Sequence, residues 1–208
     1  MLKYEWKKAA KEFYLPKNRP EVVTVPEFKF LMLDGKGNPN EAGFAEAIGV
    51  LYLLSYSLKM LPKRGITPEG YFDYTVFPLE GVWDLAEEAR GLEVLDKDSL
   101  IYTLMIRQPD FVTPELMQDI IKEVRNKKPH PLLEKVKFDT MAEGLCVQML
   151  HLGPYDDEPQ SFANMERFCS EHNLKRLSKV HREIYLSDFR KTQPDKLKTV
   201  LRFQAESI

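Results

Sequence analysis

The sequence predicts an α+β fold made of two copies of a β-α-β-β unit. Three observations lead to this prediction: similar segments recur in the same order in both halves, turn residues follow the first segment of each half, and amphipathic helical patterns come next. Two such copies can join into one antiparallel sheet with pseudo-twofold symmetry and with helices on one face. The other face is then open, and a cleft between the repeats is expected there.

The repeated segments define the expected strands. They are residues 23–33 with 140–150, residues 74–79 with 181–186, and residues 98–104 with 195–201. Both members of the first pair end in Met-Leu and align without a gap, so each is expected to form one strand. Repeat one therefore covers about residues 22–108 and repeat two about residues 136–204, within a single domain of residues 1–208.

Helices are expected where apolar residues recur at helical spacing. In repeat one this spacing predicts a helix over residues 41–60, with the apolar stripe Phe44, Ile48, Leu51, Tyr52 and Ser55. In repeat two it predicts a helix over residues 161–172, with the stripe Phe162, Met165, Phe168 and Cys169. Both stripes are assigned to the core. Thr113 and Pro114 begin a connecting helix over about residues 113–128, and residues 5–13 form a further short helix.

Composition narrows the classes of function. The 30 basic and 32 acidic residues give a formal net charge of −2. The chain therefore lacks the net positive charge that would attract nucleic acid or an anionic membrane. Cys146 and Cys169 are too few for a disulfide framework and lack metal-ligand spacing, and the four histidines do not cluster. No apolar run reaches the roughly 18 residues of a membrane helix. We therefore expect a soluble cytoplasmic protein without a metal or cofactor.

The best indication of a site is a glutamate in the strand of residues 181–186. Side chains alternate across a strand, so His181, Glu183 and Tyr185 share one face while Ile184 points to the other. An acid beside an aromatic ring can line a cleft, and pseudo-twofold symmetry would bring Tyr74 opposite this face. The alternative is a solvated strand face on which the glutamate has no role.

Several segments together resemble the GyrI-like small-molecule-binding family. They are HLGPYDDEP at 151–159, EIYLSD at 183–188, KTQPDKLKTVL at 191–201, PLEGVW at 78–83 and YTLMIRQP at 102–109. The resemblance covers about residues 22–203. The chain resembles a stand-alone branch of this family, whose members hydrolyse cyclopropanoid genotoxins.

The resemblance implies a duplicated sheet with a central cleft. It implies that a glutamate at the position of Glu183 lies at the cleft floor and meets cationic or polarised aromatic ligands. Regulators of this family also carry a helix-turn-helix head, and the roughly twenty residues before the first strand are too few for one. A direct role as a transcription factor is therefore not expected.

The candidate site residues follow from the strand pattern and the resemblance. The candidate catalytic residues are Glu183 and Glu158, and the candidate ligand-binding residues are Tyr155, Tyr185, Trp83, Glu80, Tyr74, Tyr71 and His181. Each has a structural alternative. Glu158 could begin a helix, where the macrodipole favours an acid. The aromatic residues could be packing residues, and His181 could be a structural histidine whose ring nitrogens are hydrogen-bonded.

Two functions are expected from this set of residues. The first is binding of flat hydrophobic or cationic compounds, including multidrug ligands, in an aromatic cleft with a central glutamate, for detoxification. The alternative is a hydrolase that opens the cyclopropane ring of a cyclopropanoid genotoxin by glutamate-assisted attack of water. A haem binder would need an axial ligand that the sequence does not identify, and an inhibitor of another protein would need an interaction patch. The expected partner is a small aromatic or cationic molecule, and the expected state is a monomer or homodimer.

Overall fold

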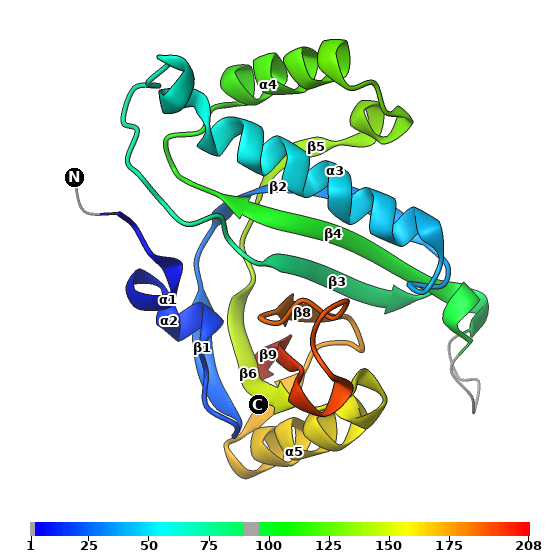
Figure 1. Cartoon of the computed structure of the whole chain (residues 1–208). Coiled ribbons are helices and arrows are strands. Elements are labelled where there is room, and N and C mark those ends of the chain that lie inside the picture. Colours follow the sequence, from blue (N-terminus) through cyan, green and yellow to red (C-terminus); the bar gives the residue numbers. More distant parts are fainter. Residues whose placement is uncertain (1–2, 90–95) are drawn as a thin grey trace. The chain divides into compact units, whose positions relative to one another are not determined.

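The computed structural model describes residues 3–89 and 96–208 and has the predicted α+β composition (Figure 1). Its α-helices are α1 Trp6–Ala9, α2 Lys11–Tyr14, α3 Ala42–Lys59, α4 Pro114–Lys127 and α5 Glu158–Glu171. Its strands are β1 Glu21–Val25, β2 Phe28–Lys36, β3 Leu79–Leu85, β4 Leu100–Gln108, β5 Lys137–Met141, β6 Gly144–Leu152, β7 Leu174–Arg176, β8 His181–Tyr185 and β9 Lys198–Ser207. Residues 1–2 and 90–95 of the predicted domain lie outside the described residues.

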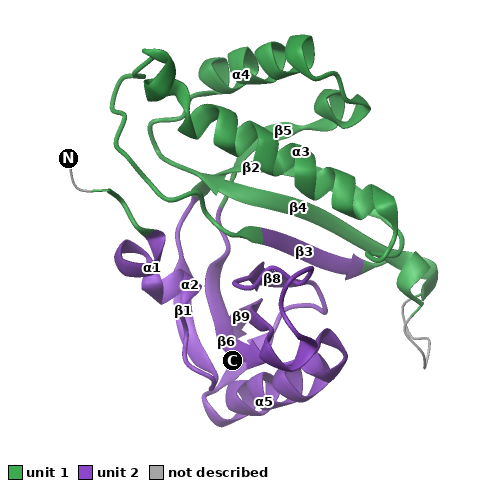
Figure 2. Cartoon of the chain, viewed as in Figure 1, with its two compact units in different colours: residues 1–5, 28–79, 85–141 green, residues 6–27, 80–84, 142–208 purple. Residues whose placement is uncertain are grey.

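The chain divides into two compact units, which Figure 2 shows in different colours. Unit 1 contains residues 1–5, 28–79 and 85–141, and unit 2 contains residues 6–27, 80–84 and 142–208. In unit 1 the strands follow the order β4-β2-β5, both pairs are antiparallel, and α3 runs along β2 and β4 (Figure 1). In unit 2 the order is β1-β6-β9-β8-β3, β7 pairs with the end of β9, and α5 packs on β6 and β9.

The first repeated block forms two strands in each half rather than one. In residues 23–33 the break falls at Pro26 and Glu27, where proline has no N–H to donate to a ladder. β1 then pairs with β6 in unit 2, and β5 pairs with β2 in unit 1. Each half of the chain thus contributes its first strand to the unit that holds the second strand of the other half. The blocks align without a gap because the break between the two strands has the same length in both halves.

The third repeated block is confirmed, and the second is not. Short 3-10 turns at Lys97–Ser99 and Pro194–Lys196 lead directly into β4 and β9, so these segments are equivalent. Residues 74–78, in contrast, precede β3, which begins at Leu79, whereas the matching residues 181–185 form β8. The alignment of residues 74–79 with residues 181–186 was therefore wrong. Glu80, Gly81 and Asp84 interrupt the apolar pattern of β3, which concealed the strand.

The predicted helices are present with shifted ends. Thr113 caps α4 by accepting a hydrogen bond from the Leu116 N–H at 3.2 Å, and Pro114 lies at the first turn, as predicted. The N-terminal helix is divided at Ala10 into α1 and α2. Among the described residues no helix has the length and the apolar character that crossing a membrane requires.

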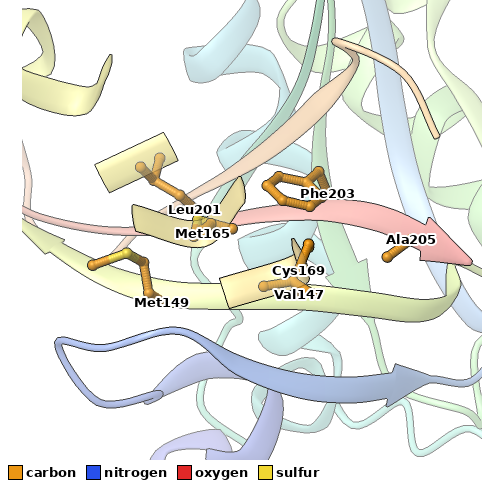
Figure 3. Packing of buried hydrophobic residues seen from close by; sticks show 7 residues of the cluster. All are labelled: Val147, Met149, Met165, Cys169, Leu201, Phe203 and Ala205. Carbon is orange, nitrogen blue, oxygen red and sulfur yellow. The ribbon is translucent and has the colours of Figure 1, made fainter. Parts of the chain in front are cut away.

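The core of unit 2 lies between its sheet and α5. Figure 3 shows its buried cluster, which consists of Val147, Met149, Met165, Cys169, Leu201, Phe203 and Ala205. Glu183 pairs directly with Leu201 in the β8–β9 ladder, and directly paired residues present their side chains on the same face of a sheet. Glu183 therefore lies on the face that α5 covers, whereas the sequence led us to expect it on the uncovered face.

Candidate functional site

Three alternate residues of β8, on the face that α5 covers, form the centre of the candidate site. His181, Glu183 and Tyr185 alternate with Arg182 and Ile184, so they share one face of the strand. The His181 Nε2 lies 3.2 Å from Glu183 Oε1, and its Nδ1 lies 3.2 Å from the Lys179 carbonyl oxygen.

A ring from α5 holds the imidazole from the other side. The Phe162 ring packs edge-on against His181, with 4.8 Å between ring centroids. Helical spacing predicted only that Phe162 belongs to the core stripe, because periodicity identifies the buried face of a helix but not the residues that it contacts. The imidazole is thus fixed between an aromatic ring and the Glu183 carboxylate.

Glu158 brings a second carboxyl group to Glu183. It is the first residue of α5, and it is 7 % exposed while Glu183 is 9 % exposed. One ligand atom from each of Glu158, His181 and Glu183 lies within 4.8 Å of the others. Burial raises the pKa of Glu158 well above its usual range. Repulsion by the Glu183 charge, a hydrogen bond that the Glu158 carboxyl donates to Glu183, and repulsion by Asp156 raise it further. Glu158 is therefore a neutral acid at neutral pH.

Two tyrosines and a tryptophan surround the carboxyl pair. The Trp83 Nε1 donates a hydrogen bond to the Tyr185 hydroxyl oxygen at 2.9 Å, and the Tyr155 and Tyr185 rings meet edge to face at 6.2 Å between centroids. An indole N–H can only donate, so the hydroxyl of Tyr185 keeps its own hydrogen for Glu183, with which it is hydrogen-bonded. Burial, followed by the Glu183 charge, raises the pKa of both tyrosines, so both phenols are protonated at neutral pH.

Gly81 makes the close approach of these rings possible. A Cβ at this position would lie 2.8 Å from Trp83 Nε1 and 3.2 Å from the Tyr185 hydroxyl oxygen. Only glycine fits there without displacing a neighbour. Gly81 was not among the residues predicted for the site. A glycine inside a strand can nevertheless indicate that another group packs closely against the backbone.

Glu80 belongs to a different cluster, on the other face of β8. Its carboxylate accepts hydrogen bonds from Arg182 at 2.6 Å and from the Tyr14 hydroxyl at 3.0 Å. Arg182 also lies 2.9 Å from Glu143, which pairs in turn with Arg202 at 3.0 Å. Burial opposes the charge of Glu143, but the two arginines lower its pKa below the usual value.

We call Glu80, Glu143, Arg182 and Arg202 the buried ion network. Together with Tyr14 it joins α2 and the strands β3, β8 and β9 of unit 2. Arg182 is the strand neighbour of both His181 and Glu183, so the network fixes the backbone that presents these two side chains. The sequence pattern gave no sign of this role, because an arginine between His181 and Glu183 also fits a surface position.

The remaining candidates lie in unit 1. Tyr71 and Tyr74 pack against Phe111, with ring centroids 5.2 Å and 6.0 Å apart. Of the nine candidate residues, the structure brings Glu158, His181, Glu183, Tyr155, Tyr185 and Trp83 together in unit 2. These six combine two carboxyl groups, an imidazole and three aromatic rings, a set that can bind a cation or transfer protons.

Comparisons with known proteins agree with the sequence resemblance. The profile of the GyrI-like small molecule binding domain matches residues 19–205. A search of curated protein sequences found no match.

Many solved structures resemble this chain, and three of them illustrate the range of similarity. A hydrolase encoded by lin2189 from Listeria innocua is 39 % identical over 99 % of this chain and 100 % of its own, with a TM-score of 0.91. An uncharacterised conserved protein from the same organism is 41 % identical over 98 % of this chain and 100 % of its own, with a TM-score of 0.89. The C-terminal domain of EcmrR is 11 % identical over 91 % of this chain and 98 % of its own, and its TM-score of 0.54 indicates a shared fold alone. The chain therefore belongs to the GyrI-like family of small-molecule-binding domains.

Proposed function

We propose that this protein binds flat hydrophobic or cationic molecules at the carboxyl pair of Glu183 and Glu158. The observation that carries the proposal is the grouping of two buried carboxyl groups with the rings of Tyr155, Tyr185 and Trp83. A cation gains from a carboxylate in a site of low dielectric, and aromatic faces attract the same charge. Asp156 and Asp188 add to the negative potential, since both act electrostatically on residues of this group.

The proposal is tested by comparing two ligands of similar shape. Ethidium is a flat aromatic cation, and phenanthridine is a neutral compound with the same ring system. Because the chain has two tryptophans, the quenching of Trp83 fluorescence is measured in a Trp6→Phe background, where it should report the binding of both. Ethidium should bind more tightly, because only the cation gains from the Glu183 charge.

A single isosteric substitution removes that charge. Glu183→Gln should weaken ethidium binding by about 10- to 100-fold, since a hydrogen bond or contact to a charged group contributes about 1.5–3 kcal/mol. It should change phenanthridine binding little. Glu171→Gln, on the exposed side of α5, is the matched control and should leave both affinities unchanged. Equal affinities of the wild type and Glu183→Gln for ethidium would refute the proposal.

A second function, hydrolysis of a cyclopropanoid compound, has specific support. A solved structure 39 % identical to this chain is that of a hydrolase, and two carboxyl groups side by side suit acid–base chemistry. In this reaction Glu183 takes a proton from water as the water oxygen bonds to a cyclopropane carbon. The ring C–C bond breaks, its electron pair moves onto the dienone oxygen, and that oxygen takes a proton from Glu158 to give a phenol. Tyr185 donates a hydrogen bond that orients Glu183.

Turnover separates the second function from binding. The dienone chromophore of a cyclopropyl-dienone compound should be lost catalytically with the wild-type protein and should persist with Glu183→Gln. Glu158→Gln should still bind the compound and convert it much more slowly, because an amide does not supply the proton. Stoichiometric binding without product would leave the binding function alone.

A further inference from the structure

Three possible metal-ligand atoms lie close together, one each from Glu158, His181 and Glu183. His181 and Glu183 stand two residues apart on β8, and Glu158 reaches them from the start of α5. One carboxylate oxygen from each glutamate and one imidazole nitrogen lie within 4.8 Å of one another. Bonds of about 2.0–2.2 Å place the ligands of one zinc ion about 3–4 Å apart, so a small side-chain adjustment would bring these atoms to coordination distance.

The imidazole is held in the orientation that a metal ligand needs. The Nδ1 of His181 faces the Lys179 carbonyl oxygen at 3.2 Å, and a carbonyl can only accept a hydrogen bond. A hydrogen on Nδ1 therefore satisfies that carbonyl, and the lone pair of Nε2 is then available to a cation placed between Nε2 and Glu183 Oε1, which lie 3.2 Å apart. Metal-ligating histidines usually donate the hydrogen of their other ring nitrogen to such a carbonyl or carboxylate.

An independent observation points to a missing ligand. Glu158 Oε1 is buried and has no hydrogen-bond partner among the described residues, although buried polar atoms are normally paired. The Tyr185 hydroxyl supports Glu183 from outside the group, in the manner of the partners that orient metal ligands. The His181 side chain, 21 % exposed, gives an ion a path from solvent.

We propose that Glu158, His181 and Glu183 form a binding site for one divalent transition-metal ion, with Zn²⁺ as the preferred ion. Zinc accepts two carboxylates and one imidazole as ligands, and Glu158 releases its proton when the ion binds, because metal ligands must be deprotonated. Three protein ligands leave a fourth position open for water or another molecule. Mg²⁺ should not bind, since it prefers oxygen ligands and retains its water. The sequence did not predict this site, because two of the ligands are two residues apart and the third comes from another element.

The metal site goes beyond the proposed function, but it uses the same carboxyl groups, those of Glu158 and Glu183. A zinc ion would occupy the place where an organic cation is proposed to meet Glu183, so the two should compete. Ethidium binding without zinc binding would overturn the metal site alone. Zinc binding without ethidium binding would overturn the proposed function alone.

Calorimetric titration of chelator-treated protein with ZnCl₂, and separately with MgCl₂, tests the metal site. Zinc should bind with one-to-one stoichiometry and Mg²⁺ should give no binding heat. Glu158→Gln and His181→Ala should each weaken zinc binding by at least about tenfold, since even residues that only support a metal ligand contribute that much. The far-UV and near-UV circular dichroism of both variants should match the wild type, which keeps the comparison valid.

The matched control is His172→Ala, which removes an exposed histidine at the end of α5. It should leave zinc binding unchanged. Absence of one-to-one binding by the wild type would overturn the proposal. So would zinc binding that survives both Glu158→Gln and His181→Ala, or that is lost in His172→Ala. If either site variant fails to fold, Co²⁺ added to the wild type decides. A visible ligand-field spectrum of low coordination number supports the site, and an octahedral spectrum overturns it.

Discussion

Arg182→Met should destabilise the protein strongly although it lies outside the ligand group. The Arg182 side chain is 2 % exposed and meets Glu80 at 2.6 Å and Glu143 at 2.9 Å. Methionine is shorter than arginine but replaces its apolar stem, so it keeps part of the packing and leaves two buried carboxylates with one cation fewer. The substitution therefore measures chiefly the loss of charge pairing.

The magnitude follows from the burial of both partners. Removing one member of a buried ion pair costs about 3–5 kcal/mol, because the desolvated partner stays behind without compensation. Each kcal/mol shifts the melting temperature of a chain of this size by about 2–4 °C, so the expected decrease is about 6–20 °C. Arg182→Met combined with Glu80→Gln should recover part of the loss, because one of the uncompensated carboxylates is then removed.

Urea denaturation followed by circular dichroism measures the change. Lys137→Met is the control, since Lys137 forms an exposed ion pair with Asp34 at 2.5 Å and exposed pairs contribute little to stability. Its unfolding midpoint should match the wild type. A loss below about 1 kcal/mol in Arg182→Met, the size of an exposed pair, would refute the reasoning that the network is held by buried charge.

Three further predictions concern unit 2. Gly81→Ala should shift the emission of Trp83 and weaken ethidium binding, because the added methyl group displaces the indole from the Tyr185 hydroxyl; an unchanged emission spectrum would contradict it. The pKa of Glu143 is lowered in the folded protein, so its stabilising contribution should be complete above pH 4.5, its ordinary pKa, and should be lost as pH falls further through the lowered folded value. Glu143→Gln should flatten that part of the stability profile, and a wild-type profile already flat there would oppose this reasoning. Met165→Ala should cost about 2–5 kcal/mol in urea denaturation, since Met165 is fully buried in the core cluster; a cost near zero would mean that the core closes around the cavity.

The sequence predicted the elements of the fold better than their connections. Helical spacing located α3 and α5 because both bury one apolar stripe, and Thr113 located α4 because capping is a local interaction. The exchange of β1 and β5 between the units was not predictable, since hydrogen bonds between distant strands leave no trace in local periodicity. The β3 strand was missed because its polar residues serve the buried ion network and the ring contact at Gly81.

The candidate site was predictable where alternation along one strand decides the outcome. That rule placed His181, Glu183 and Tyr185 together, and the family resemblance added Trp83 and Glu158. Strand alternation did not separate Glu80 from the other candidate residues. The pairing of Glu80 with Arg182 depends on which face of the neighbouring strand β8 the Glu80 side chain contacts. Nor did alternation reveal that α5 covers Glu183, since helix placement depends on packing across the whole unit.

A crystal structure of the protein with ethidium bound would show whether Glu183 is the binding group. The phenanthridinium ring should contact the Glu183 carboxylate and pack against at least one of Tyr155, Tyr185 and Trp83. Ethidium bound away from Glu183, with the carboxyl pair of Glu158 and Glu183 undisturbed, would contradict this prediction.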